Sequence, residues 1–136
     1  MGCVEAEAST WRLPSLLQKH PEYEESPIKN EEVLDFRALF HHAGNNDKVA
    51  KDVLNHCISA WAAGIITMIH AFDPERIILS GGIMKSSAVI LPALQEKVDQ
   101  LAWTAWGKVK LTEAKFPCSA ALYGADYLVR SKINSK

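Results

Sequence analysis

Cysteine, net charge and long apolar runs are all scarce in this 136-residue sequence. Its three cysteines are odd in number and far apart, which is not a disulfide framework, so we expect a reducing, cytoplasmic location. Fifteen Lys and Arg against sixteen Asp and Glu leave a net charge of −1. Without a basic field, we expect neither nucleic acid nor a membrane surface as partner. The longest mostly apolar run, residues 60–72, is shorter than the roughly 20 residues that a bilayer span needs.

The composition is sufficient for one folded domain. Apolar residues make up 48% of the chain and charged residues 23%, which allows a hydrophobic core and is not typical of disorder. The N-terminus lacks a basic start followed by an apolar stretch, so we expect no signal peptide.

The first third of the chain predicts short, interrupted helices. Residues 4–19 favour helix but are broken at Pro14, and residues 20–30 carry two prolines and predict a loop. Asn30 is expected to cap a helix that runs through Phe40. We therefore expect residues 1–45 to form a helical segment.

A long helix is the strongest prediction in the sequence. Apolar residues at three-and-four spacing follow the turn that ends at Asp47 and continue to Phe72, where an Asp-Pro pair stops the helix. On its polar face, Lys48 and Asp52 are spaced to pair. Gly64 lies inside this helix, where it costs roughly 1 kcal/mol relative to alanine. We expect close packing at Gly64, by the sheet in preference to a ligand.

The rest of the chain alternates strands with helices. Residues 77–79 are a continuous apolar run, which predicts a strand buried on both faces, and residues 108–113 alternate as a second strand. A helix is expected from about Leu91, with Pro92 in its first turn, to about Trp103 or Trp106, and a last helix over residues 119–130.

This order of elements predicts an α/β fold with parallel strands and right-handed crossovers. Two strands are too few for three helices to cover. Further strands must come from an upstream segment or from a partner molecule, and so we interpret the chain as a fragment. Its open sheet edges and apolar faces predict self-association into a homo-oligomer, most simply a dimer.

Taken without context, the candidate sites are weak. Gly81 and Gly82 follow a strand, where glycine lets the backbone approach a nucleotide. A tight turn that needs a positive φ is the better explanation of the pair, and no GxxxxGK[ST] motif occurs. Cys3 is one thiolate, whereas structural zinc takes four ligands. His41 and His42 would point about 100° apart on a helix and could not easily share a metal.

Two stretches together resemble the ROK family (repressor, open reading frame, kinase). The run Gly2-Cys3-Val4-Glu5-Ala6 is similar to the end of the family signature CxCGxxGCxE. Residues 64–83 resemble the family's helix, Asp-Pro turn and strand that ends in glycines, and residues 116–125 resemble its last helix.

The resemblance implies the actin-like ATPase fold, with two ribonuclease H-like domains around a cleft. Many members are sugar kinases that use ATP and magnesium on glucose, N-acetylglucosamine, N-acetylmannosamine or fructose, and others are sugar-sensing repressors. By position, Glu5 matches the sugar-contacting glutamate and Cys3 the last cysteine of a structural zinc site. Gly81 and Gly82 match glycines near the adenosine, with Ser80 in place of the first glycine of that run.

Several parts of the family pattern are absent from the sequence. The other zinc ligands, the phosphate-binding DxGGT segment and the catalytic-base aspartate do not occur, so we assign no catalytic residue to this chain and expect it alone to be inactive. We predict the C-terminal part of a ROK sugar kinase: a partial ribonuclease H-like domain in which residues 46–136 form the nucleotide-binding portion. The alternatives are the effector domain of a ROK repressor and a non-catalytic α/β interaction module.

Overall fold

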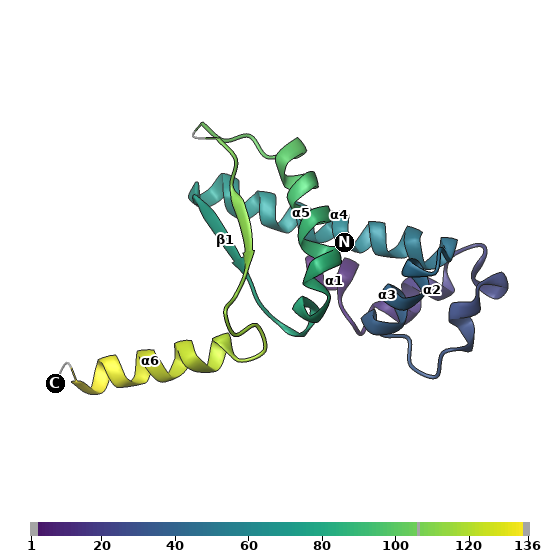
Figure 1. Cartoon of the computed structure of the whole chain (residues 1–136), viewed down its shortest axis with the longest axis horizontal. Coiled ribbons are helices and arrows are strands. Elements are labelled where there is room, and N and C mark those ends of the chain that lie inside the picture. Colours follow the sequence, from purple (N-terminus) through teal and green to yellow (C-terminus); the bar gives the residue numbers. More distant parts are fainter. Residues whose placement is uncertain (1–2, 106, 135–136) are drawn as a thin grey trace.

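The computed structural model describes residues 3–105 and 107–134. Two strands form one sheet with helices packed on one of its faces, and α6 extends away from the body of the molecule (Figure 1). The elements in chain order are α1 (Val4–Ala8), α2 (Leu13–Gln18), η1 (Tyr23–Glu25), η2 (Pro27–Asn30), α3 (Phe36–Gly44), α4 (Lys48–Phe72), β1 (Arg76–Leu79), η3 (Gly82–Ser86), α5 (Ser87–Leu101), β2 (Lys110–Glu113) and α6 (Ala120–Asn134).

The 25-residue helix α4 organises the core, as its periodicity predicts. Asp47 caps it by accepting a hydrogen bond from the Ala50 N–H at 2.7 Å, and Asp73 ends it in the left-handed conformation with φ of 45°. By length and apolar composition α4 could cross a bilayer, the one such helix in the described part of the chain. It packs instead against α1, α3 and α5, which is the arrangement of a core helix.

The helix predicted to begin after Asn30 begins later, at Phe36, so that prediction is wrong. Asp35 is its cap and accepts from the Ala38 N–H at 2.9 Å, whereas Asn30 ends η2. The reason lies upstream: Ser26 accepts from the Ile28 N–H at 3.2 Å and donates to Asp47 at 2.8 Å. These bonds hold the proline-containing segment in a tight 3₁₀ turn with Ile28 buried.

The predicted Lys48–Asp52 pair does not form. Lys48 forms an ion pair with Glu22, and Asp52 lies 3.3 Å from His20 Nε2. The Glu22 hydrogen bond raises the pKa of Lys48. Both pairs connect the loop after α2 to the first turns of α4. Lys48 and Asp52 therefore each pair with a residue of this loop and not with each other.

The two strands pair in parallel, with Ile77 opposite Leu111, as the alternation of helix and strand predicts. Burial on both faces of β1 is not found. Ile77 and Leu79 are half-buried on the side of α4 and α5, but Ile78 is 64% exposed on the other face. In the described part of the chain nothing packs over that second face, because α6 points away from it (Figure 1).

Helix α5 begins at Ser87, four residues before the predicted start, so Pro92 lies inside it. The 3₁₀ turn η3 leads directly into this helix. Pro92 cannot donate to the carbonyl of Ala88, but both residues are exposed, and solvent can satisfy that carbonyl. The helix ends at Leu101, short of the predicted end, and Trp106 lies outside the described residues.

Candidate functional site

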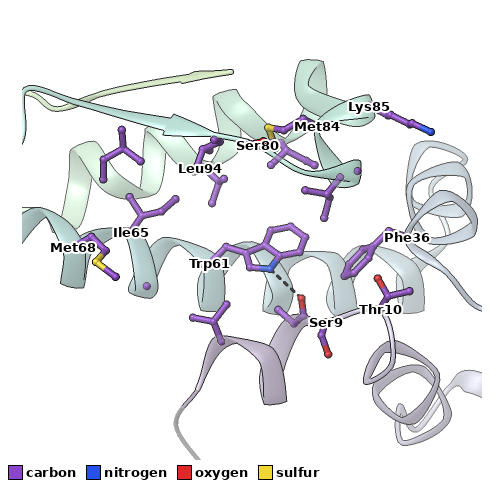
Figure 2. A pocket seen from close by; sticks show the side chains of 18 of the residues that line it. Ser9, Thr10, Phe36, Trp61, Ile65, Met68, Ser80, Met84, Lys85 and Leu94 are labelled. Carbon is purple, nitrogen blue, oxygen red and sulfur yellow. Dashed lines mark hydrogen bonds between the residues drawn. The ribbon is translucent and has the colours of Figure 1, made fainter. Parts of the chain in front are cut away.

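The described residues form a wide apolar groove of about 1230 Å³. It lies between β1, η3 and α5 on one side and α4 and α1 on the other (Figure 2). Most of its lining is aliphatic or aromatic; the polar residues Ser9, Thr10, Asp35, Arg37, Ser80 and Lys85 also take part. Such a concave apolar surface with a few polar groups is the usual form of a binding site.

Two of the aromatic side chains that line the groove, Phe36 and Trp61, contact each other. The rings of Phe36 and Trp61 lie 5.3 Å apart at 49°, a tilted contact that stabilises beyond its buried area. The Trp61 Nε1–H donates to the Ala8 carbonyl at 3.0 Å (the dashed line in Figure 2). This bond fixes the end of α1 on α4 and so shapes the groove at its centre.

The close packing predicted at Gly64 is present, but its partner is α1 and not the sheet. A Cβ at Gly64 would lie 2.8 Å from Cγ2 of Val4, closer than real Cβ contacts allow. The missing side chain therefore lets α1 lie directly on α4. Val4 itself lines the groove, so this contact also positions the N-terminal motif beside the candidate site.

The turn after β1 forms another part of the groove wall. Gly81 has φ of 111°, a conformation that L-residues with a side chain rarely adopt, which confirms the turn interpretation of this glycine. The Ser80 hydroxyl and the Gly81 N–H both donate to the Pro117 carbonyl, at 2.8 and 2.9 Å. Ser80 and Gly82 line the groove at the carboxyl end of the strand, where ligands bind in open α/β sheets.

The residues of the N-terminal motif lie on or just before the short helix α1. Cys3 caps it, since its Sγ accepts from the Ala6 N–H at 3.4 Å, and both Cys3 and Glu5 are exposed. Glu5 does not line the groove, although its neighbour Val4 does. Among the described residues no group of three or more His, Cys, Asp and Glu side chains could hold a metal ion. The sugar and zinc roles of Glu5 and Cys3 stay predictions.

The buried cysteine and three of the histidines have structural surroundings. Burial raises the pKa of Cys57 to about 12, which leaves it an unreactive thiol. His42 is buried, with Nε2 2.8 Å from Glu31 Oε1, and His41 contacts its ring edge-on. His70 accepts from the Trp103 N–H at 3.2 Å.

Sequence reasoning missed most of the apolar groove lining. Trp61, Met68 and Phe72 belong to the apolar residues at three-and-four spacing that predicted this helix, a stripe that normally faces a core. In the structure Met68 and Phe72 are 54% and 75% exposed at the groove. The spacing of an apolar stripe identifies the face of a helix but does not say whether anything covers it.

Comparison with known proteins now identifies the family. The ROK family sequence profile matches residues 1–132. The chain belongs to the ROK family. The match includes the N-terminal motif, the helix that carries Gly64, and the strand that ends at Leu79, which are stretches on which the resemblance was based.

The most similar proteins include enzymes and a regulator of this family. A curated glucokinase from Thermotoga maritima is 27% identical over 97% of this chain and 44% of its own length. A solved ROK family glucokinase from Streptomyces griseus, in complex with glucose and AMPPNP, has a TM-score of 0.76 at 22% identity and matches 96% of this chain and 45% of its own. A solved ROK family transcriptional regulator, a homologue of the E. coli MLC protein, has a TM-score of 0.64 at 22% identity, over 82% of this chain and 29% of its own.

The chain thus spans less than half the length of the ROK glucokinases that it matches. Its mixed α/β fold with a two-stranded parallel sheet corresponds to part of the ROK kinase fold.

Proposed function

We propose that this chain is the C-terminal, nucleotide-binding portion of an ATP-dependent ROK sugar kinase, which transfers a phosphoryl group to a hydroxyl of a hexose or N-acetylhexosamine. One observation carries the proposal. The turn of Ser80, Gly81 and Gly82, at the family's glycine positions, opens onto the large groove at the carboxyl end of β1. Glucokinases among the relatives agree with this reading.

In this proposal the chain's own residues bind the nucleotide and orient the sugar. The exposed backbone at Gly82 has no side chain and nothing within 4 Å of a Cβ position, so a nucleotide can approach it closely. Glu5 accepts hydrogen bonds from sugar hydroxyls and orients the sugar. ATP supplies the phosphoryl group, with magnesium offsetting its charge. The base that accepts the hydroxyl proton is an aspartate outside this sequence.

Nucleotide binding to the isolated chain tests the proposal. In ¹H–¹⁵N spectra recorded with AMPPNP and magnesium, we expect the largest shifts at the amides of Ser80, Gly81 and Gly82. Gly82→Ala should weaken binding at unchanged stability, because its Cβ has free space but stands in the path of the ligand. Gly124→Ala on α6 is the matched control, with equally free space, and should leave binding unchanged. Shifts confined to other parts of the chain would contradict the assignment.

Catalysis by this chain alone is not expected, because it contains none of the family's catalytic machinery. A coupled assay of ADP release with glucose, N-acetylglucosamine and N-acetylmannosamine should show no turnover. A rate in the normal range of kinases, roughly 1–100 per second, would contradict the interpretation as a fragment.

A sugar-sensing effector domain of a ROK repressor is the second candidate function. The likeness to a solved ROK transcriptional regulator favours it. Sugar binding that depends on Glu5, without nucleotide binding, would support this candidate. Binding of neither ligand would support the non-catalytic interaction module.

Four further proposals accompany this function. The protein is cytoplasmic, and residues 46–136 form the nucleotide-binding portion after a helical segment of residues 1–45. Zinc binds weakly or not at all here, since Cys3 alone cannot supply the usual four ligands; one tightly held zinc per chain after dialysis would contradict this. The isolated chain forms a homo-oligomer, for which the exposed apolar side chains of α6 are the surface we favour.

A further inference from the structure

Strand β2 has an inner edge that pairs with β1 and an outer edge on the opposite side. On the inner edge, the N–H groups of Lys110 and Ala114 donate to carbonyls on the β1 side, at 3.2 and 2.8 Å. Successive peptide groups of a strand point to alternate edges, so the Val109 carbonyl and the Leu111 N–H point outward. Among the residues that the structure describes, no strand pairs with this outer edge.

The side chain of Gln95, on α5, lies on this outer edge. Its Oε1 accepts from the Leu111 N–H at 2.9 Å, and its Nε2 donates to the Val109 carbonyl at 3.0 Å. A residue of a neighbouring parallel strand would bind the same two groups, through its own N–H and carbonyl. A side-chain amide carries the same kinds of donor and acceptor as a peptide group. Gln95 therefore replaces one repeat of strand pairing.

Two charged residues hold the Gln95 amide in this orientation. Its Nε2 also donates to Asp99 Oδ1 at 2.7 Å, and Asp99 Oδ2 accepts from Lys108 Nζ at 2.6 Å. A flipped amide would set its oxygen against the Asp99 carboxylate and the Val109 carbonyl, which are both acceptors. The amide therefore has one favourable orientation, and in that orientation it pairs with the strand edge.

Without Gln95, this edge would suit the same strand of a second copy. An unpaired edge is a template for a strand of another molecule. Two β2 strands can pair antiparallel about a two-fold axis at Leu111. Lys110 then lies opposite the second copy's Thr112, and no like charges meet in this register. Such pairing needs the Val109 carbonyl and the Leu111 N–H, which Gln95 already binds.

We propose that Gln95 closes the outer edge of β2 against strand addition, and that the partner it excludes is the β2 strand of a second copy. Asp99 and Lys108 are positioning residues, because they act through the Gln95 amide. The inference concerns this edge alone and depends on neither the kinase nor the repressor function. Association through α6 uses a different surface and is compatible with a closed edge.

Hydrogen exchange of the Gln95→Ala variant tests whether the amide holds the edge. Alanine favours the helix and removes both bonds to the strand, so the Leu111 amide should exchange roughly tenfold faster, as expected for about one lost hydrogen bond. Gln100→Ala is the matched control on the same helix, because Gln100 bonds to Glu96 and not to the strand. It should leave exchange at Leu111 unchanged. The Leu94 amide, inside α5, reports opening of the whole fold, and an equal increase there would overturn the local assignment.

Association tests whether the closed edge excludes a second copy. In Gln95→Ala, the Leu111 amide should regain protection as the protein concentration rises, and sedimentation should show a larger dimer fraction than in Gln100→Ala. Gln95→Met keeps the length of the side chain without its amide, and it should give both results if the alanine variant does not fold.

Two results would overturn the inference. One is exchange at Leu111 that does not change when Gln95 is substituted, which would show that the amide does not hold the edge. The other is faster exchange at Leu111 that stays the same at every protein concentration. In that case the open edge binds no second copy, and Gln95 does not serve to exclude one.

Discussion

Gly64→Ala should destabilise this protein, although the same change stabilises most helices. In a helix interior, alanine gains about 1 kcal/mol over glycine. Here the new Cβ would lie 2.8 Å from Cγ2 of Val4, and a β-branched side chain on a helix has little freedom to rotate away. Overpacking of this kind costs about 1–3 kcal/mol. Taking about 2 kcal/mol for the clash, the net loss of stability is about 1 kcal/mol.

The sign of this effect should reverse when Val4 is shortened. In a Val4→Ala background the obstructing methyl groups are gone, so Gly64→Ala should stabilise by about 1 kcal/mol through helix propensity alone. The two substitutions are then coupled by about 2 kcal/mol. Urea unfolding of the four proteins, followed by far-UV circular dichroism, measures both values. Stabilisation by Gly64→Ala in both backgrounds would refute the packing of α1 on α4.

Three further predictions follow from the other helices and from the charged surface. A thiol reagent should modify two of the three cysteines quickly in the native chain and reach Cys57 only on unfolding, because burial raises its pKa to about 12; rapid labelling of all three would contradict its burial. The hydrogen bonds from Lys108 and Gln95 lower the pKa of Asp99, so their contribution to stability is present at neutral pH and is lost as the pH falls through that lowered value. Lys108→Met should move the carboxyl titration of Asp99 back toward its ordinary pKa in ¹³C NMR, and an unchanged titration would show that this ion pair does not form. Leu128→Asp on α6 should shift the chain toward monomer in sedimentation across a concentration series, whereas an unchanged distribution would show that another surface drives association.

Local chemistry in the sequence was enough to predict the elements that depend on it. Asp47 and the apolar spacing after it define α4, and a cap followed by six turns of regular pattern has no competing arrangement. The parallel pairing of β1 and β2 followed from the intervening helix, because such a connection joins parallel strands. The positive φ of Gly81 was expected from glycine at the end of a strand.

The predictions that depended on contacts between distant segments were less accurate. Asn30 was a reasonable cap, but the Ser26–Asp47 bond, which spans 21 residues, fixes the preceding turn and moves the start of α3 to Phe36. The neighbour of Gly64 could not be identified because α1 is far away in sequence.

The apolar groove was missed for a related reason. The patterns of β1 and α4 are those of buried elements, yet Met68 and Phe72 are exposed at the groove and Ile78 is exposed on the other face of the sheet. Side chains selected for burial that lie in solvent indicate a protein surface that another segment is meant to cover. The periodicity of a sequence indicates which residues are suited to burial. Only the structure shows whether another segment buries them.

The carbonyl of Pro117 connects the turn after β1 to the segment that precedes α6. It accepts from both Ser80 and Gly81, so the turn after β1 is tied to the segment from which α6 departs. Fifteen residues of helix extend about 22 Å beyond that point. A tilt of about 10° at its base would therefore carry the far end of α6 through about 4 Å, given the same helical rise. The position of the far end of α6 therefore depends strongly on the geometry of the segment that the Ser80 and Gly81 bonds hold.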